Sequence, residues 1–401
     1  MNEFKLRASW GQQGNQNTAD FATLSTFGSN PNTADYDLNG SNTDVVQGLV
    51  VATRGNPNLR WETTTQANIG LDLSLFDNKW TTSVDAYRKV TSDILLPNPQ
   101  IAAVGEGSFP IVNAATVENI GLDWETSYRH ENPVRDRGYQ IDFIVSTFKN
   151  TVLDLGENIG NIGYDDEYYI DGADGPTRIA VGYPIGSFYG WVADGIFESD
   201  EAVNTHPYQL GAAPGRIRYA NLDGDSLITA ADRTYIGSPY PKLTLSGNYT
   251  YHVGQWDISA FAYANLGQKV YNETKWYTDF AQNGNFNHGS ALLDAWSESN
   301  TSSSIPAPTL NNNNNESRAS SYFVENASFL RLRSVKASYT IPLKDQKSIS
   351  LSVEGQNLLT LTNYSGVDPE VTFSGNANFP GIDRGAYPLA RTFLFGINFK
   401  M

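Results

Sequence analysis

Side chains that carry oxygen atoms between Asn221 and Asp232 have the spacing of a divalent-cation loop, with the sequence NLDGDSLITAAD. Counted as twelve positions, the segment offers side-chain oxygens at positions 1, 3, 5, 9 and 12 and a backbone carbonyl at position 7. These donors are Asn221, Asp223, Asp225, Thr229, Asp232 and the carbonyl of Leu227. Hard cations prefer oxygen ligands of this kind. The pattern therefore predicts one bound Ca²⁺ or Mg²⁺ with a structural role, and we expect Ile228 to tuck the loop against its neighbours.

Two positions of this loop depart from the cation-binding pattern. Position 6, where the turn favours glycine, is Ser226, and position 12 is an aspartate where a longer glutamate would bind through both oxygens. Asn221 at position 1 also carries no charge. The alternative is an acidic turn held by hydrogen bonds from its own side chains to its own backbone. We expect no organic cofactor.

No residue pattern in the chain is typical of a catalytic site. The four histidines form no HExxH motif, and the chain contains neither a GxSxG elbow nor a P-loop. The acids Asp165, Asp166 and Glu167 could serve a glycosidase, but a solvated loop cluster is the simpler interpretation. We therefore expect a protein that is not an enzyme.

Composition narrows the remaining function classes. The net charge of -16 argues against a nucleic-acid partner, because such binding needs a basic surface. The absence of cysteine excludes disulfides and thiolate metal sites. The first ten residues, MNEFKLRASW, contain no apolar core of a signal peptide, so for an exported protein we expect the true N-terminus to lie upstream.

The elements that must position these groups are long strands with a period of two. From Trp61 to Leu75 an apolar-and-threonine set alternates with a polar set, and after a turn at residues 77–79 the alternation resumes at Trp80. Strands of soluble domains usually run ~5–6 residues. A much longer alternating strand suits a sheet with lipid on one side and water on the other. The predicted fold class is all-β, an antiparallel transmembrane β-barrel.

Ten such strands are expected along the chain. They lie near residues 4–10, 61–75, 80–95, 116–130, 139–153, 243–251, 256–271, 322–341, 349–361 and 387–401. A slip of phase between Leu332 and Val335 predicts a β-bulge.

The connections between these strands alternate strictly in length. The long ones are 12–58, 96–115, 154–237, 272–320 and 362–386, and the short ones are 77–79, 132–138, 252–255 and 342–348. Outer-membrane barrels have this asymmetry, with long extracellular loops and short periplasmic turns. Residues 154–237 are then one long extracellular loop region that carries the candidate cation loop, with room for short strands of its own.

Two sets of side chains could meet a ligand on such a wall. The charged residues of the polar strand faces are interpreted as wall residues wetted by a channel: Glu62, Asp72, Asp85, Asp123, Glu125, Arg129, Asp142 and Glu354. Five aromatic residues in or beside the outer loops could stack on sugar rings or contact a partner: Tyr189, Trp191, Trp276, Tyr277 and Trp296. For these rings, packing within the loops or against a partner protein is the alternative.

Several local motifs now match one family. They are NPNLRWETT (56–64), GYPIGSFYGW (182–191), ADGIF (193–197), NLDGD (221–225), DR (232–233), IGSPYPK (236–242), SFLRLR (328–333), QNLLT (356–360), VDPE (367–370) and the ending from Tyr387 to Met401. Together they resemble the C-terminal part of the SusC/RagA-type TonB-dependent outer-membrane transporters of Bacteroidetes. The resemblance covers nearly the whole chain.

That resemblance implies a 22-stranded barrel in the outer membrane, of which residues 1–401 would be about the last ten strands. The plug, the TonB-binding motif and the early strands of the family are not found, so the chain is expected to be a fragment. The resemblance further implies energy delivered by TonB, contact with outer-membrane lipid, a SusD-like surface lipoprotein over the mouth, and import of an oligosaccharide or a peptide. It does not choose between glycan and peptide.

A protein of a different class is the alternative. A soluble or surface-bound β-rich carbohydrate-binding protein would also carry aromatic residues on strands. The outward apolar faces separate the two hypotheses, because each such face needs either lipid or a second sheet to cover it. A closed sandwich with Trp124 and Tyr249 in a dry core would contradict the barrel.

Overall fold

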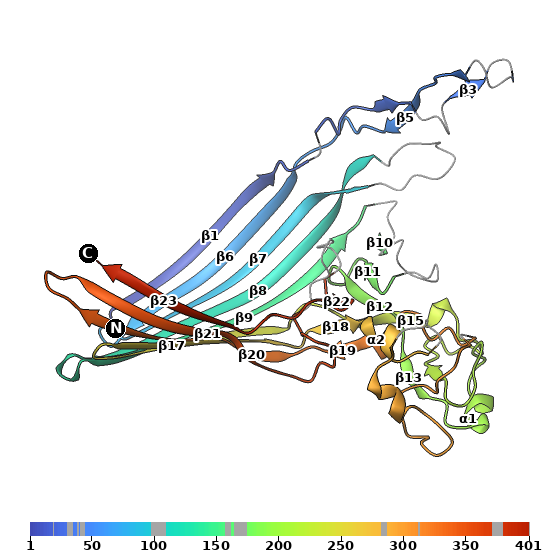
Figure 1. Cartoon of the computed structure of the whole chain (residues 1–401). Coiled ribbons are helices and arrows are strands. Elements are labelled where there is room, and N and C mark those ends of the chain that lie inside the picture. The colour runs from blue at the N-terminus through green and yellow to red at the C-terminus, as the bar shows by residue number, and fades with distance from the viewer. Residues whose placement is uncertain are drawn as a thin grey trace.

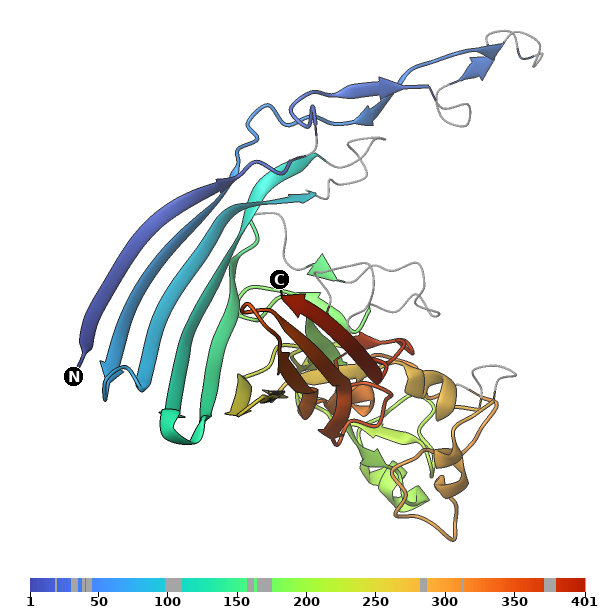
Figure 2. The same cartoon turned by 60° about the vertical axis from the view of Figure 1, so that its left-hand side comes forward.

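One antiparallel sheet of ten strands dominates the computed structural model of the chain (Figure 1). The structure describes residues 1–18, 20–29, 35–37, 40, 45–97, 110–156, 162–163, 175–281, 287–311, 313–370 and 380–400. In spatial order the strands are β1 (Glu3–Asn15), β6 (Glu62–Leu75), β7 (Trp80–Pro97), β8 (Ile111–Asn132), β9 (Arg137–Asp154), β16 (Leu243–Val253), β17 (Trp256–Leu266), β20 (Phe329–Pro342), β21 (Ser348–Thr362) and β23 (Thr392–Lys400). The predicted contiguous, strongly curved wall is confirmed (Figure 2).

Short turns join the strands at one end of this sheet, and their residues explain why they are short. Left-handed backbone is found at Asp77 and Asn78 between β6 and β7, at Gly254 between β16 and β17, and at Asp345 and Gln346 between β20 and β21. Glycine adopts this conformation without steric cost, and Asn and Asp tolerate it better than other residues. The chain can therefore reverse within a few residues at this end.

The strand register aligns the apolar residues into a continuous belt. Paired residues of nine neighbouring strands form one row across the sheet: Leu6, Leu71, Val84, Trp124, Val145, Leu245, Ala264, Leu330 and Leu361. A shift of one residue in any strand would move its apolar side chains to the opposite face. Because the row crosses nearly the whole sheet, the apolar faces of the separate strands become a single surface.

Most of the belt is not covered by other parts of the described chain, although Ala264 is buried. Trp124 is 37% exposed and Tyr249 is 42% exposed, so neither lies in a dry core between two sheets. Sheet-on-sheet packing would bury these residues instead. The closed sandwich expected for a soluble protein is therefore not the fold of this chain.

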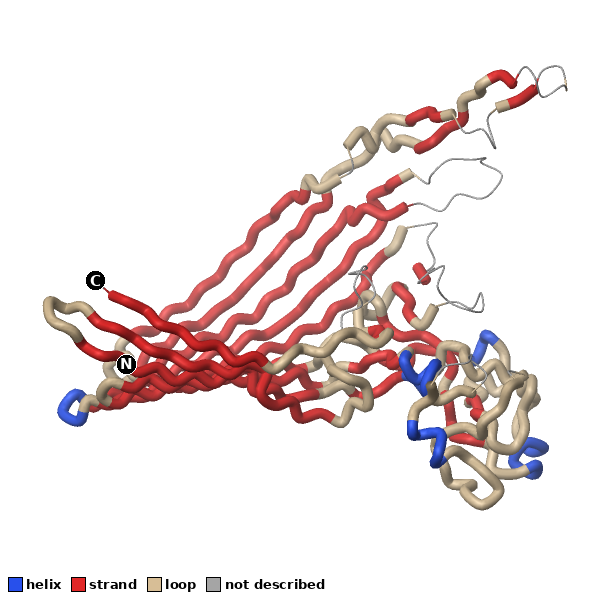
Figure 3. Tube along the Cα trace, in the orientation of Figure 1, coloured by secondary structure: helices blue, strands red, loops and turns tan. Residues whose placement is uncertain are grey.

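The buried apolar core lies in the loop region, beyond one end of the large sheet. One cluster joins the ends of β8 and β9 to the loops through Ala115, Val117, Val152, Leu155 and Ile179. The second lies wholly among the small elements and comprises Phe188, Ile217, Tyr219, Tyr271, Phe280, Phe323 and Ile382. Figure 3 shows most helical segments gathered in this region. No helix of the described residues is long and apolar enough to cross a membrane.

Small sheets and short helices build that region. The sheets are β10 (Ile162–Gly163), β11 (Thr177–Ile179), β12 (Ser187–Trp191) and β15 (Arg233–Gly237); β13 (Ala193–Ile196) and β14 (Ile217–Tyr219); β18 (Lys269–Asn272), β19 (Val324–Asn326) and β22 (Ile382–Asp383); β2 (Thr26–Gly28) and β5 (Val50–Thr53); and β3 (Tyr36–Asp37) and β4 (Val45–Val46). The helices are α1 (Asp200–Thr205) and α2 (Thr274–Thr278), and the 3₁₀ turns are η2 (Pro133–Arg135), η3 (Ala230–Asp232), η4 (Ser290–Asp294) and η5 (Ser321–Phe323).

The predicted bulge is confirmed, whereas several strand boundaries were wrong. The register shifts between Leu332 and Ser334 against both neighbouring strands: Arg333 is the extra residue against β17, whereas against β21 the extra residue lies on β21, where Asn357 and Leu358 oppose Arg333. The strand expected from Tyr322 begins only at Phe329, because the Asn326 side chain accepts a hydrogen bond from the Ser328 N–H and turns the chain between β19 and β20. β1 also continues to Asn15 and β8 begins at Ile111, since cross-strand pairing extends both strands into expected loops.

Candidate functional site

The polar face of the sheet gathers most of the predicted wall charges into bonded groups. Arg7 of β1 donates to both oxygens of Asp72 on β6 and to both oxygens of Asp85 on β7, with all four N···O distances at 2.8 Å. Ser83 adds a bond of 2.8 Å to Asp72. One guanidinium thus ties three strands together, which suits the rigid fork of arginine. Arg7 was not among the predicted wall residues.

The other predicted wall residues also find partners along the same face. Asp142 accepts hydrogen bonds from Ser127, Gln140 and Asn248. Glu354 accepts one from Gln356, and Arg129 pairs with Glu131. Glu62 accepts from Asn15 and from the Leu95 N–H. Among the described residues, no contact singles out Asp123 or Glu125 for a ligand, so their role as solvent-exposed wall residues stays a prediction.

Gly70 makes room for the Arg7 bridge. It pairs with Arg7 on one side and Asp85 on the other, and a Cβ at this position would lie 2.4 Å from Asp85 Oδ1 and 2.7 Å from Arg7 Cζ. The guanidinium therefore crosses over the bare backbone of β6. A side chain at this position would push the ion pair apart.

We expect Gly70→Ala to lower the free energy of unfolding by about 1–3 kcal/mol, the usual effect of overpacking. Thermal unfolding of the intact protein in detergent measures the change. Gly247→Ala is the matched control, because a Cβ there has no neighbour closer than 3.8 Å. Equal melting temperatures for the two variants would contradict the role given to Gly70.

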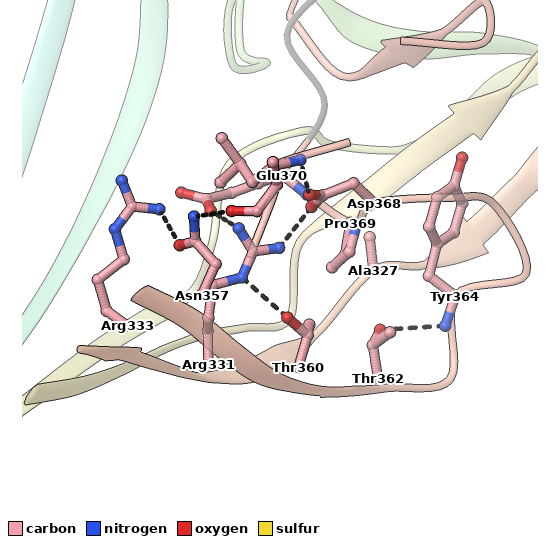
Figure 4. Close-up of polar contacts among 12 residues, drawn as sticks. Ala327, Arg331, Arg333, Asn357, Thr360, Thr362, Tyr364, Asp368, Pro369 and Glu370 are labelled. Carbon is pink, nitrogen blue, oxygen red and sulfur yellow. Dashed lines mark hydrogen bonds and ion pairs between the residues drawn. The ribbon is translucent and has the colours of Figure 1, made fainter. Parts of the chain in front are cut away.

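A second polar cluster joins two of the sequence motifs where the wall meets the loops (Figure 4). Arg331 of β20 is only 2% exposed and donates to Asp368 at 2.5 Å, to Glu370 at 2.7 Å and to Thr360 at 3.0 Å. Glu370 also accepts from the hydroxyl of Tyr263 on β17. The motif SFLRLR thereby holds the motif VDPE against the inner wall, an arrangement that the separate motifs did not predict.

Asp368 organises the backbone of the attached loop. Its Oδ1 accepts from the Glu370 N–H at 2.9 Å, and its Oδ2 accepts from the Leu389 N–H at 3.2 Å. Burial raises the pKa of Asp368, but the hydrogen bonds from Glu370, Arg331 and Leu389 and the positive charge of Arg331 outweigh burial and lower this pKa. The carboxylate is therefore ionised at neutral pH, as the ion pair requires.

The candidate cation loop is held by its own hydrogen bonds. Asn221 accepts from the Gly224 N–H, Asp223 from the Asp225 N–H and Asp225 from the Leu227 N–H, at 2.7, 3.1 and 2.6 Å. Asp232 is fully buried, and its two oxygens accept from the N–H groups of Leu222 and Thr229, each at 2.7 Å. This is the turn structure given above as the alternative to a bound ion.

Other contacts fix the place of this loop. Ile228 packs against the larger buried cluster, as expected, and the Thr229 carbonyl accepts a hydrogen bond from the indole of Trp191 at 3.0 Å. Within the described residues, no group of three or more Asp, Glu or His side chains is placed to hold a metal ion. The bound ion therefore stays a prediction.

We expect isothermal titration of the intact protein with CaCl₂ to give one binding site that weakens in Asp223→Ala and in Asp225→Ala. Each substitution removes one charged oxygen donor from the predicted site. Asp200→Ala, in the first turn of α1, is the control because it lies outside the loop. Identical calcium titrations for wild type and both loop variants would mean that this loop holds no metal.

The five predicted aromatic contact residues fall into two groups. Tyr189 and Trp191 lie on β12 and stack with arginines: Arg178 lies 3.6 Å from the centre of the Tyr189 ring, and Arg318 lies 4.9 Å from that of Trp191. Their faces thus have partners within the chain. Contact of these two rings with a ligand or a partner protein stays a prediction.

The second group consists of Trp276, Tyr277 and Trp296. Trp276 packs against the larger buried cluster and contacts the Tyr277 ring edge-on, with 4.8 Å between ring centres. The Trp296 ring lies so close to Gly215 that a Cβ there would come within 2.6 Å of it. Trp276 and Trp296 thus pack within the loops, whereas Tyr277 is 39% exposed. Contact of these three rings with a ligand or a partner protein stays a prediction. The acids 165–167 lie outside the described residues.

Comparison with known proteins gives one consistent result. Residues 1–358 match the family described as TonB dependent receptor-like, beta-barrel. The chain is 32% identical over 414 residues to TonB-dependent receptor P3 of Formosa agariphila, covering 99% of this chain and 39% of that protein. It is 26% identical over 417 residues to TonB-dependent receptor SusC of Bacteroides thetaiotaomicron, covering 100% of this chain and 38% of that protein.

Solved structures share the fold. A structure of the RagAB peptide transporter superposes with a TM-score of 0.76 at 23% identity, over 98% of this chain and 40% of the matched one. This chain spans about 40% of the length of the relatives it matches.

Proposed function

Because this chain belongs to the TonB-dependent receptor-like β-barrel family, we propose that it forms part of the wall of an outer-membrane active transporter. The transporter imports a ligand too large for simple porins, an oligosaccharide or a peptide. The matched family is one of receptors for transport, so we propose no catalytic activity for this chain.

The observation that carries this proposal is the opposition of two continuous faces on one sheet. The apolar belt from Leu6 to Leu361 suits the hydrocarbon layer of a membrane, and it has no covering protein layer among the described residues. The opposite face carries the charged and hydrogen-bonded groups around Arg7, Asp142 and Arg331. A wall with lipid on one side and a wetted lumen on the other accounts for both faces.

The partners follow from the same family membership. We propose that TonB delivers the energy through parts of the protein outside residues 1–401, and that a SusD-like lipoprotein closes over the loop region. The loop region offers a broad folded surface for such a partner, because two buried clusters hold its small sheets together. The name of one matched structure supports a peptide as one of the two ligand classes, because it describes the RagAB peptide transporter.

Deletion of the gene tests the proposed function. We expect the deletion strain to lose growth on one specific glycan or peptide source and to keep normal growth on simple sugars. A strain complemented with the intact gene is the control, and a strain without TonB should show the same loss. Unchanged growth and uptake on every glycan and peptide source would overturn the proposal.

A further inference from the structure

A cavity of about 590 Å³ opens where the polar face of the sheet meets the loop anchored by Arg331. Its volume lies in the range of small-molecule binding sites, ~300–1,000 Å³. The charged and polar groups on its walls include Asn265, Lys269, Arg333, Asp368, Glu370 and Tyr387. They come from β17, β18, β20 and the loop after β21, so several distant segments of the chain build this one cavity.

The two carboxylates of the cavity wall already have partners within the protein. Asp368 accepts from Arg331 and from two backbone N–H groups, and Glu370 accepts from Arg331 and from the Tyr263 hydroxyl. Arg331 itself is 2% exposed, so its positive charge interacts only with groups inside this cluster. The carboxylates therefore offer little to a cation that enters the cavity.

The two cations of the cavity wall, Arg333 and Lys269, have no carboxylate partner among the described residues. Arg333 donates one hydrogen bond of 2.8 Å to the Asn357 side chain, and no described carboxylate lies within ion-pair distance of it. In the described part of the chain, no carboxylate lies within ion-pair distance of Lys269 either. Figure 4 shows Arg333 beside the Arg331 cluster, with its guanidinium joined to Asn357.

The bulge and its partner explain how Arg333 is held in this position. Arg333 lies at the register shift between β20 and β21, opposite Asn357 and Leu358, and Asn357 adopts a left-handed backbone with φ of 53°. The Asn357 side chain binds Arg333 through its oxygen and the Ala390 carbonyl through its nitrogen. The guanidinium is thereby oriented before any ligand arrives, which lowers the cost of binding.

We propose that this cavity binds a carboxylate group of the imported ligand through Arg333 and Lys269. The inference deepens the proposed function, on which it rests, by naming an anionic ligand. The fork of Arg333 matches a carboxylate in two parallel hydrogen bonds, and Lys269 adds a point charge. An acidic sugar and an acidic peptide share this group.

Calorimetry on the purified intact transporter tests the site with two pairs of probes. Trigalacturonate is compared with maltotriose, and tetraglutamate with tetraglutamine. We expect one acidic probe to bind and its neutral counterpart to bind at least about tenfold more weakly, because a charge-assisted pair is lost. Which acidic probe binds distinguishes the sugar from the peptide.

Variants identify the residues. Arg333→Gln and Lys269→Gln should each weaken binding of the acidic probe about tenfold or more, and Arg333→Lys should weaken it less. Lys336→Gln, on the same strand and paired with Glu354, is the matched control and should bind as wild type does. Equal binding by wild type and Arg333→Gln, or no preference for either acidic probe, would overturn the site. A growth defect of the deletion strain in that case would leave the proposed transport function standing.

Discussion

Replacing Arg331 by methionine should destabilise the protein by about 3–5 kcal/mol, the loss found when one partner of a buried ion pair is removed. The substitution removes the cation that pairs with both Asp368 and Glu370, so their two negative charges repel each other. Both carboxylates are partly buried, with side-chain exposures of 12% and 33%. The loop motif VDPE should then leave the wall. Chemical denaturation of the intact protein in detergent measures the stability, and limited proteolysis detects the released loop.

Two further variants separate the ion pair from a general packing effect. Arg333→Met removes a guanidinium from the same strand that makes one hydrogen bond to a neutral side chain, so it should change stability little. The triple variant Arg331→Met, Asp368→Asn, Glu370→Gln removes the uncompensated charges and should recover most of the loss. If Arg331→Met and Arg333→Met were equally stable, the anchoring role of Arg331 would be wrong.

Arginine should be tolerated at position 146 of β9 and not at position 145. Val145 lies in the apolar belt, between Trp124 and Leu245, whereas Ser146 lies between Asp123 and Thr244 on the polar face. A positive charge on the lipid face of a barrel costs ~2–4 kcal/mol near the middle of the membrane and is tolerated in the lumen. We therefore expect Val145→Arg to reduce assembly into the outer membrane strongly and Ser146→Arg to assemble as wild type does.

Heat-dependent mobility of the two variants in outer-membrane fractions checks this expectation, with Val145→Leu as the control for a change of size alone. Because positions 145 and 146 are neighbours on one strand, they differ in the face on which the side chain lies and in little else. Equal assembly of both arginine variants would show that the two faces do not meet different solvents.

Much of the large sheet could be predicted from local sequence. The period of two in segments such as Trp61–Leu75 gives both the strand and its two faces, and Asp77 and Asn78 mark the turn that follows. The bulge at Arg333 also left a visible slip of phase. Strand ends were less predictable, because the extension of β8 back to Ile111 depends on pairing with β7 and not on its own residue types.

The polar clusters could be predicted only in part. Asp72 and Asp85 were expected on the polar face, but their partner Arg7 lies more than sixty residues earlier in the chain, where no local pattern connects it to them. Gly70 gives no sequence signal of the guanidinium that passes over it. The motifs around Arg331 and Asp368 were recognised separately in the sequence, and Arg331 was not among the predicted wall residues. The contact between Arg331 and Asp368 could not be predicted, because only the folded chain brings the two motifs together.

Spin labels at two adjacent positions test the central claim most directly, namely that this sheet separates lipid from a wetted lumen. The 401 residues contain no cysteine, so single cysteines introduced as Val145→Cys and Ser146→Cys can be labelled specifically once any cysteines elsewhere in the intact protein are replaced. With the transporter in liposomes, we expect the label at position 145 to collide mainly with oxygen, which dissolves in lipid. The label at position 146 should collide mainly with a water-soluble nickel chelate. The same accessibility at both positions, or the reverse order, would contradict the account.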